Sequence, residues 1–396
     1  MRKTHNRKLR FLPITAAKVA LIVMIFSSTG SALADDEETA AEKIVTFYAT
    51  YGYREDDTWI IPLRIWVRER PDFVRRMAAK GAREEIAERA GLESLNETQK
   101  DLFMSRADGF IADSESNEEV IFVFDADPDR ETFHLVNGEG ESETDRNGLI
   151  EGSLKLPNDK VQILLNAQES PNGWLTYRAI SEDHGGVGRV RLVGPQGVSV
   201  ISDIDDTVKV TDIPAGEPVV LRNTFFNDFV AAPCMAEMYQ AFGGDVAFHY
   251  VSGGPWQLYE PLAQFLFGES AGFPGGSFHM KNVRTNPFES ETYQDLWTLI
   301  VNGSQQATFE QKVDQISTLI TRFPGRTFVL IGDSGERDPE VFRVIKERFS
   351  DQVQEIRIRD VVNDRENNAG RLDEMSVIPA GLDQDSCREF LQNGGS

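Results

Sequence analysis

Acidic side chains follow, after one intervening residue, two mostly apolar runs of this 396-residue sequence. The run at 198–201 leads to Asp203 and Asp205, and the run at 328–331 leads to Asp333. Carboxylates gathered at one strand end repel each other unless a cation is present, so without a chemical role they would only lower the stability of the fold. Two carboxylates two positions apart can take separate tasks, one attacking phosphorus and the other moving a proton. The pattern therefore predicts phosphoryl chemistry.

The first acidic segment has two other interpretations. A calcium-binding loop would need Gly at the sixth position of the motif, and Val208 stands there. A solvated acidic turn is the second alternative, but it does not explain the apolar run that precedes the acids.

A third strand-like run, at 248–251, ends at Ser252 and Gly253. A hydroxyl at a strand end, followed by glycine and the start of a helix, can bind a phosphoryl oxygen with help from backbone N–H groups. The alternative is that Ser252 only caps the helix.

A lysine and a second acid complete the set of candidates. Lys312 lies near the start of the helix-like stretch 309–323 and could neutralise phosphoryl charge, or it could lie on a solvated helix face. Asp333 could bind a divalent cation beside Asp203, and Asp338 could join it or orient a metal-bound water. Because Mg²⁺ favours a few carboxylates with waters and phosphate oxygens, we expect Mg²⁺. The alternative is an acidic turn in solvent.

The surrounding elements predict how these residues are positioned. Buried strand-like runs alternate with amphipathic stretches over the C-terminal half, which is typical of a doubly wound, mostly parallel α/β sheet. The expected helical stretches are 235–242, 255–267 and 309–323. Ligands of such sheets bind beyond the carboxyl ends of the strands, where the acids lie.

The N-terminal half favours a different architecture. Short strand-like segments bounded by turn residues predict a β-rich, sandwich-like domain with a helical insertion between residues 71 and 110. After the insertion we expect strands at 120–124, 132–136, 148–156, 161–165 and 174–180. The glycine-rich stretch 185–188 lacks the spacing of a nucleotide loop and is interpreted as an interdomain turn.

The first residues are typical of a signal peptide. A basic stretch precedes an apolar run at 19–26 and an Ala-Leu-Ala pattern ending at Ala34. The run is too short to cross a bilayer, which needs about 20 apolar residues. We expect a leader at 1–34, a β-rich domain at 35–192, a catalytic domain at 193–366 and a tail at 367–396. Export to the bacterial periplasm or the extracellular space follows, with no transmembrane span after cleavage.

Charge and cysteine content restrict the partners further. The formal net charge is −23, and removal of a leader with six basic residues and no acid would change it to −29. Such a chain repels nucleic acid, which we exclude as a general partner.

Cys234 and Cys387 could form one disulfide in an oxidising compartment, or both could be unpaired buried thiols.

The order of the motifs carries a resemblance. Ser202 to Lys209 resembles the D-x-D-x-T motif of the haloacid dehalogenase superfamily. The segments at 251–259 and 330–340 are similar to the phosphatidate phosphatase family typified by the fungal actin patch protein, with lipin-like catalytic motifs. The resemblance covers about residues 190 to 365 and implies a haloacid dehalogenase-like catalytic fold.

The resemblance also implies a role for each matching residue. Asp203 would be the nucleophile and a Mg²⁺ ligand, and Asp205 would be the general acid and base, with its backbone carbonyl facing the metal. Thr207 would orient the site, while Ser252 with Gly253 would bind phosphate. Lys312 matches the lysine of the family's motifs, with Lys281 and Arg284 as alternatives. Asp333 matches the motif residue that binds the metal, and Asp338 is a secondary candidate for the same role.

The substrate is the least constrained part of the interpretation. Resemblance implies hydrolysis of phosphatidate to diacylglycerol and phosphate, with peripheral membrane contact. Apolar residues after the first motif, including Leu221 and Phe225, could meet acyl chains or could be ordinary core. Because the chain is expected to be exported, a soluble phosphomonoester is the alternative substrate. A catalytically inactive module that binds metal or a partner is the second alternative.

Overall fold

Alternating apolar residues build the central strand of the N-terminal half. In the computed structural model, strand β3 (Thr58–Glu69) directs Ile61, Leu63, Ile65 and Val67 into one core, as the two-residue period of a strand requires. The structure describes residues 43–170, 172–181, 183–268, 271–282 and 305–392. The predicted leader at 1–34 lies outside these residues.

Ten strands of this half form one mixed sheet. Its main path runs β6-β5-β8-β10-β2-β3-β1-β9, with β4 and β7 also paired to β3. The other strands are β1 (Lys43–Phe47), β2 (Thr50–Glu55), β4 (Asp113–Ser114), β5 (Ile121–Phe124), β6 (Thr132–His134), β7 (Leu149–Pro157), β8 (Trp174–Ala179), β9 (His184–Gly185) and β10 (Val187–Leu192). Phe47 of β1 contacts Phe122 of β5 and Tyr177 of β8, so distant parts of the sheet share one core.

Two predictions in this half are wrong. Residues 161–165 belong to helix α3 (Asn158–Ala167), because Val161 and Leu164 bury one helical face while Ile163 is exposed. Gly185 ends strand β9 and Gly188 lies in strand β10, with Gly186 between the two strands, so the stretch is not an interdomain turn. A Cβ on Gly186 would lie 2.0 Å from the carbonyl oxygen of Val45, so the close approach of neighbouring backbone requires glycine.

The predicted helical insertion is confirmed as a pair of helices, α1 (Phe73–Arg89) and α2 (Glu97–Ile111). Asp72 caps α1, and Asn96 forms a capping box with Gln99 at the start of α2. Both helices pack against α4 (Glu217–Phe225) of the C-terminal half.

Six strands of the C-terminal half form an entirely parallel sheet, as the alternating pattern predicts. The order is β13-β12-β11-β14-β15-β16. Their bounds are β11 (Gly197–Ser202), β12 (Ala247–Pro255), β13 (Ser277–Lys281), β14 (Arg326–Asp333), β15 (Val353–Asp360) and β16 (Ser376–Pro379). The chain moves outward from β11 in one direction and from β14 in the other, so the strand order reverses between these two neighbours.

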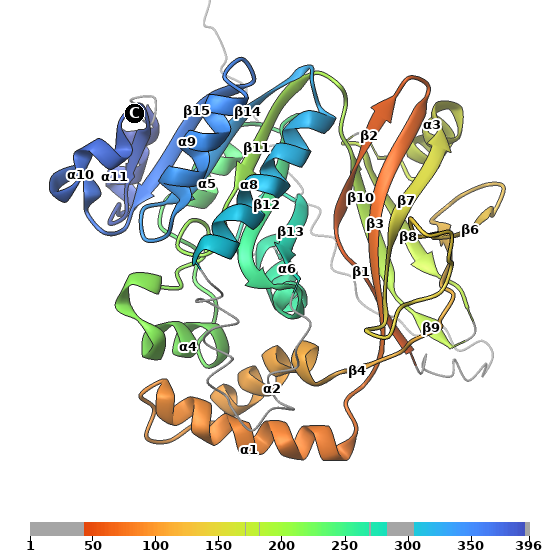
Figure 1. The fold of residues 1–396 in the computed structure, drawn as a ribbon, viewed down its shortest axis with the longest axis horizontal. Helices are drawn as coiled ribbons and strands as arrows, with labels where there is room; N and C mark the ends of the chain where they lie inside the picture. Colours follow the sequence, from red (N-terminus) through yellow and green to blue (C-terminus); the bar gives the residue numbers. More distant parts are fainter. Residues whose placement is uncertain (1–42, 171, 182, 269–270, 283–304, 393–396) are drawn as a thin grey trace, which may run out of the picture. The chain divides into compact units, whose positions relative to one another are not determined.

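Helices cover both faces of the parallel sheet. The remaining helices are α5 (Met235–Gln240), α6 (Tyr259–Phe267), α8 (Gln305–Arg322), α9 (Asp338–Arg348), α10 (Asp364–Asn367) and α11 (Gln384–Gln392). Figure 1 shows α8 and α9 in front of β11 and β14. Val200 packs in the core with α4 and α5, whereas Ile201 packs in the core with α8 and α9, so successive side chains of β11 are buried on opposite faces.

Residues 40–396 form one compact unit. Ala49 of the N-terminal half donates its backbone N–H to the Tyr259 hydroxyl and accepts from the backbone N–H of Phe278. Cys234 and Cys387 form a disulfide that ties α11 to α5.

The division of the chain near residue 192 stays a prediction. Among the described residues, no helix has the length and apolar character needed to cross a membrane.

Candidate active site

The acids predicted from separate motifs meet at the reversal of strand order. Asp203 follows β11, Asp333 ends β14, and Asp338 begins α9. All three are buried, and one carboxylate oxygen of each lies within 4.8 Å of the others. The register places Ser202 beside Ile331, which brings the two strand ends level.

A single lysine lies between these acids. The Lys312 Nζ atom is 2.8 Å from Oδ1 of Asp203, 2.6 Å from Oδ1 of Asp338 and 3.5 Å from Oε2 of Glu336. Lys312 is 3% exposed, so it is not on a solvated helix face. Burial disfavours its ammonium form, but the surrounding carboxylates outweigh burial and raise the pKa of Lys312.

The alternative lysine is placed differently. Lys281 is at the end of β13 and is only part-buried. Arg284, the other alternative, lies outside the described residues. Contact with Asp203 therefore distinguishes Lys312 from Lys281.

The acidic cluster carries more negative charge than Lys312 can balance. Burial, with repulsion from Asp338, raises the pKa of both Asp203 and Asp333 well above the usual range. Oδ2 of Asp203 and Oδ2 of Asp333 are buried and have no hydrogen-bond partner. Unsatisfied buried carboxylate oxygens in a close group fit the oxygen ligands that a hard divalent cation prefers. These residues could therefore hold Mg²⁺.

Asp205 points to a different set of partners. Its Oδ1 is 2.9 Å from Nζ of Lys209 and accepts a 2.6 Å hydrogen bond from the Thr211 hydroxyl. Burial acts to raise the pKa of Asp205, but Lys209 and Thr211 outweigh it and the net shift is downward. The Asp205 side chain is not part of the three-acid group, and a metal contact through its backbone carbonyl stays a prediction.

Ser252 connects the second motif to the first. Its hydroxyl accepts from the backbone N–H of Gly254 at 2.9 Å and donates to Oδ2 of Asp205 at 3.3 Å. It therefore both stabilises the irregular end of β12 and reaches the candidate acid. A Cβ on Gly253 would lie 2.8 Å from the Thr308 side chain, so glycine lets α8 approach this end of the strand.

The turn after the first motif is held by its third acid. Asp206 has φ of 55°, and its carboxylate accepts from the backbone N–H groups of Thr211, Asp212 and Ile213. Arg359 donates to the Asp206 carbonyl at 2.7 Å. Thr207 is fully buried and its hydroxyl has no partner. Orientation of the site by Thr207 stays a prediction.

Two site residues were missed by the motif analysis. Lys209 was signalled by its spacing of four from Asp205, and Glu336 by its place in the same acidic segment as Asp333. Neither spacing by itself tells a buried ion pair from a solvated one, so only the packing reveals them.

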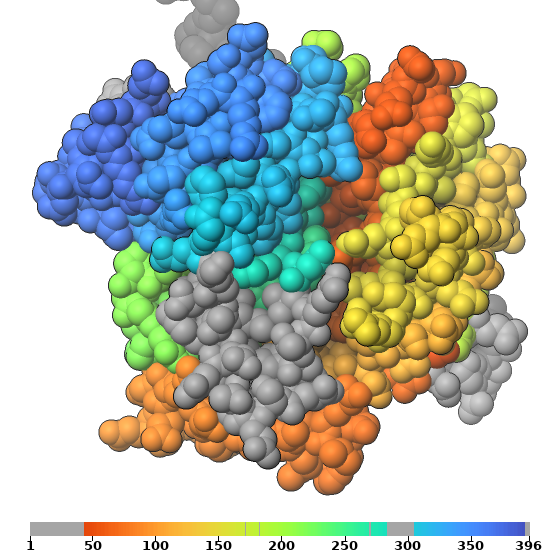
Figure 2. Space-filling model, viewed as in Figure 1, coloured from red at the N-terminus to blue at the C-terminus, as the bar shows by residue number. Residues whose placement is uncertain are grey.

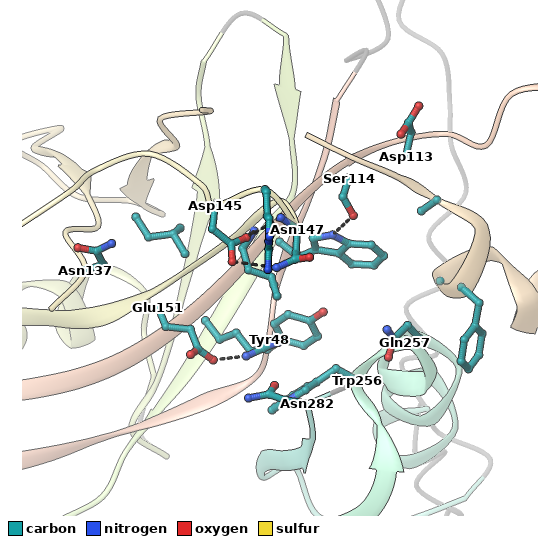
Figure 3. A pocket seen from close by; sticks show the side chains of 18 of the residues that line it. Tyr48, Asp113, Ser114, Asn137, Asp145, Asn147, Glu151, Trp256, Gln257 and Asn282 are labelled. Atoms are coloured by element: carbon teal, nitrogen blue, oxygen red, sulfur yellow. Dashed lines mark hydrogen bonds and ion pairs between the residues drawn. The ribbon is translucent and has the colours of Figure 1, made fainter. Parts of the chain in front are cut away.

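Part of the acidic cluster lines a cavity. This cavity, of about 260 Å³, is lined by Lys312, Glu336 and Asp338, together with Phe309. A larger cavity, of about 710 Å³, shares no lining residue with the acidic cluster. Figure 3 shows Asp145 and Asn147 on one side of it and Trp256 and Gln257 on the other.

Most of the apolar residues after the first motif are core, although Val230 is 59% exposed. Leu221, Phe225 and Phe226 are each at most 1% exposed and pack with Phe103 of α2. They are therefore not available at the mouth of the site in this structure.

Comparison with known proteins finds relatives of part of this chain. Residues 198–360 match the family model described as phosphatidate phosphatase APP1, catalytic domain. Phosphatidate phosphatase APP1 of Saccharomyces cerevisiae is 31% identical over 172 residues, which are 42% of this chain and 26% of that protein. An uncharacterized protein of Schizosaccharomyces pombe is 27% identical over 183 residues, which are 44% of this chain and 27% of that protein.

The match therefore spans about a quarter of the length of these curated relatives. A crystal structure of Ruminococcus gnavus beta-glucuronidase aligns at 11% identity with a TM-score of 0.20, covering 83% of this chain and 46% of that one, and supports no conclusion about fold. Strands β12, β14 and β15 and the acidic cluster lie inside the matched segment, which begins within β11 and ends before β16. Through residues 198–360, this chain is similar to the catalytic domain of the phosphatidate phosphatase APP1 family.

Proposed function

We propose that this protein is a Mg²⁺-dependent phosphatase of the haloacid dehalogenase-like fold, with a sandwich-like β-rich domain before the catalytic one. The contact of Lys312 with Asp203 and Asp338, beside unsatisfied oxygens of Asp203 and Asp333, is the observation that supports it most strongly. The substrate we propose is phosphatidate, since the match to the APP1 catalytic domain supports that activity.

The mechanism we propose has two in-line steps. A carboxylate oxygen of Asp203 forms a bond to phosphorus while the ester P–O bond breaks, and protonated Asp205 gives its proton to the leaving alkoxide. Asp205 then takes a proton from water as the water oxygen attacks phosphorus, and the acyl-phosphate P–O bond breaks. Phosphate leaves and the Asp203 carboxylate is regenerated.

Charge neutralisation makes the first step feasible. Lys312 reduces the repulsion between the Asp203 carboxylate and the phosphoryl oxygens. We infer that the Ser252 hydroxyl, which donates to Asp205 in this structure, donates to a phosphoryl oxygen when substrate binds. When bound by Asp203, Asp333 and Asp338, Mg²⁺ supplies the remaining positive charge.

Asp205 must lose a partner before it can act as an acid. Lys209 and Thr211 hold it as a carboxylate in this structure, and the lowered pKa of Asp205 opposes protonation. We infer that substrate binding weakens the contact between Asp205 and Lys209, so that Asp205 takes up the proton needed by the leaving group.

Replacing the nucleophile tests the proposal. We expect Asp203→Asn to lower phosphate release by about a thousandfold or more, since an amide cannot attack phosphorus as a carboxylate does. Asp314→Asn, an exposed acid on the same helix as Lys312, is the matched control and should retain activity. Phosphate release should also require added Mg²⁺. Turnover by Asp203→Asn at the wild-type rate would rule out the aspartyl-phosphate mechanism.

Substrate choice is tested by a second comparison. Phosphatidate in mixed micelles should be hydrolysed more efficiently than water-soluble phosphomonoesters. The reverse preference would favour the alternative of an exported phosphatase that acts on soluble phosphomonoesters. Absence of phosphate release from both, with Mg²⁺ bound, would favour a catalytically inactive metal-binding or partner-binding module. Export to the periplasm or the extracellular space remains part of the proposal and is tested by cell fractionation.

A further inference from the structure

Helix α1 exposes apolar side chains on the face that normally carries polar ones. Phe73 is 78% exposed, Val74 72% and Met77 49%. At 100° per residue these three side chains project opposite Ala79, Ala82 and Ile86, which are buried. Single exposed apolar residues are common, but three that adjoin on one helix indicate an interaction surface. We call Phe73, Val74 and Met77 the α1 apolar patch.

Basic residues lie beside this patch over residues 73–83, between the exposed acids Asp72 and Glu84, although the chain as a whole is strongly acidic. Residues 73–83 contain three arginines and one lysine but no acid. The first turn of α1 contains no acidic residue. Because the positive end of the helix dipole favours acids there, Arg75 and Arg76 oppose the local electrostatics of the helix. Arg76 and Lys80 are exposed and flank the patch.

The helix that carries the patch is held firmly at both ends. Arg75 contacts Asp113 at 2.5 Å and donates to the Ala112 carbonyl at 3.0 Å. At the other end, Arg89 forms an ion pair with Glu217 of α4. Figures 1 and 2 show α1 at the lower edge of the view, beyond α2 and α4. The exposure of Phe73 is therefore not the fraying of a loose helix end.

We propose that the α1 apolar patch inserts into an anionic lipid surface, with Arg76 and Lys80 contacting the lipid headgroups. Apolar side chains that project from a helix and are flanked by cations match the two components of such a surface, hydrocarbon and negative charge. The charge complementarity selects an anionic over a neutral surface, since the chain at −23 is otherwise repelled. The inference rests on the proposed function, because it supplies the surface in which phosphatidate would be presented to the site.

Vesicle binding by the full chain tests this inference. The probe is vesicles of phosphatidylcholine with and without phosphatidylglycerol, which is not a phosphomonoester and so does not engage the catalytic site. We expect binding to the anionic vesicles only. The triple variant Phe73→Ser, Val74→Ser, Met77→Gln should bind at least about tenfold more weakly, and Arg76→Gln with Lys80→Gln should weaken binding by about fivefold per basic residue. Val187→Ser, at a valine that is 63% exposed on β10, is the matched control.

The outcomes separate this inference from the proposed function. Loss of vesicle binding with unchanged hydrolysis of p-nitrophenyl phosphate by the triple variant supports the patch as a lipid-docking surface. Wild-type binding by the triple variant, or no binding by the wild type, overturns it. A dimer that the triple variant abolishes, without vesicle binding, also overturns it and assigns the patch to a second copy of the chain. Failure to hydrolyse any phosphomonoester would contradict the proposed function and leave the vesicle result intact.

Discussion

Lys312 is the residue on which the balance of charge at the site depends. It is the shared partner of Asp203 and Asp338, and all three side chains are at least 96% buried. Removing one member of a buried ion pair leaves an uncompensated charge in a poorly solvated place, which costs more than the pair itself contributes. The lysine therefore has a structural as well as a chemical role.

Substitution of Lys312 should separate these roles from those of Lys281. We expect Lys312→Met to lower the free energy of unfolding by about 3–5 kcal/mol and to abolish phosphate release. Lys281→Met is the control, since Lys281 is part-buried and has no ion pair among the described residues; its effect on stability should stay within about 1 kcal/mol. Urea denaturation measures both variants. Equal stabilities would mean that the cluster is not held by Lys312.

At the scale of elements, the helical insertion is joined to the C-terminal half by aromatic packing. Phe103 of α2 is fully buried, and its ring lies 5.7 Å from that of Phe225 and 5.4 Å from that of Phe226. Arg106 adds a 2.7 Å hydrogen bond to the Thr224 carbonyl. Helix α4 thus packs against α1 and α2, which lie far from it in the sequence.

This packing predicts a large difference between two phenylalanines of the insertion. Phe103→Ala should destabilise the protein by about 3–5 kcal/mol, because it removes a buried ring and leaves a cavity. Phe73→Ala, at a side chain that is 78% exposed, should change stability by less than about 0.5 kcal/mol. Thermal or urea unfolding of the two variants provides the comparison. Similar losses would contradict the burial of Phe103.

The disulfide is a second link between elements. Cys234 and Cys387 are separated by 153 positions, so the bond closes a long loop of the unfolded chain. We expect Cys387→Ser, with Cys234→Ser to avoid a free thiol, to cost about 2–5 kcal/mol of stability. Unfolding of wild type with and without a reductant should give the same difference. A stability that does not respond to reductant would show that the bond contributes little.

At the scale of the whole molecule, two histidines lie where the two sheets meet. The ring of Tyr51 on β2 is 5.3 Å from that of His249 on β12 and 5.8 Å from that of His279 on β13. Burial lowers the pKa of His249 well below its ordinary value and that of His279 to about 3, and Arg326 and Arg322 nearby add to these effects. Both rings are therefore neutral in the folded protein.

These shifts predict how stability depends on pH. The unfolded histidines take up protons below about pH 6.5, whereas the folded ones do not, so stability falls as pH decreases from about 6.5 towards 3. For His279 the loss between pH 7 and pH 5 should be about 2 kcal/mol, at about 1.4 kcal/mol per pKa unit. The difference from His279→Gln, measured by urea denaturation at each pH, isolates this contribution. Parallel pH profiles for the two proteins would refute it.

The sequence by itself determined the chemical groups and the strand ends that carry them. The runs before Asp203, Ser252 and Asp333 are buried on both faces, so their mostly apolar character makes them recognisable without a structure, even though Ser199 and His249 interrupt two of them. The strands β13, β15 and β16 were not predicted. In β15, charged residues such as Arg357 and Arg359 alternate with apolar ones, which hides the strand from a search for apolar runs; Arg357 pairs with Glu355 of the same strand, whereas Arg359 donates to the Asp206 carbonyl.

Only the tertiary structure decided which side chains meet. Spacing along the chain suggested Lys312, but the choice between it and Lys281 depended on how α8 packs against the sheet. The same is true of the pair formed by Asp205 and Lys209, of the disulfide, and of the contact between α2 and α4. A local pattern specifies periodicity and residue type. Contacts between residues far apart in the sequence, and the burial of near pairs such as Asp205 and Lys209, depend on the packing of the entire core.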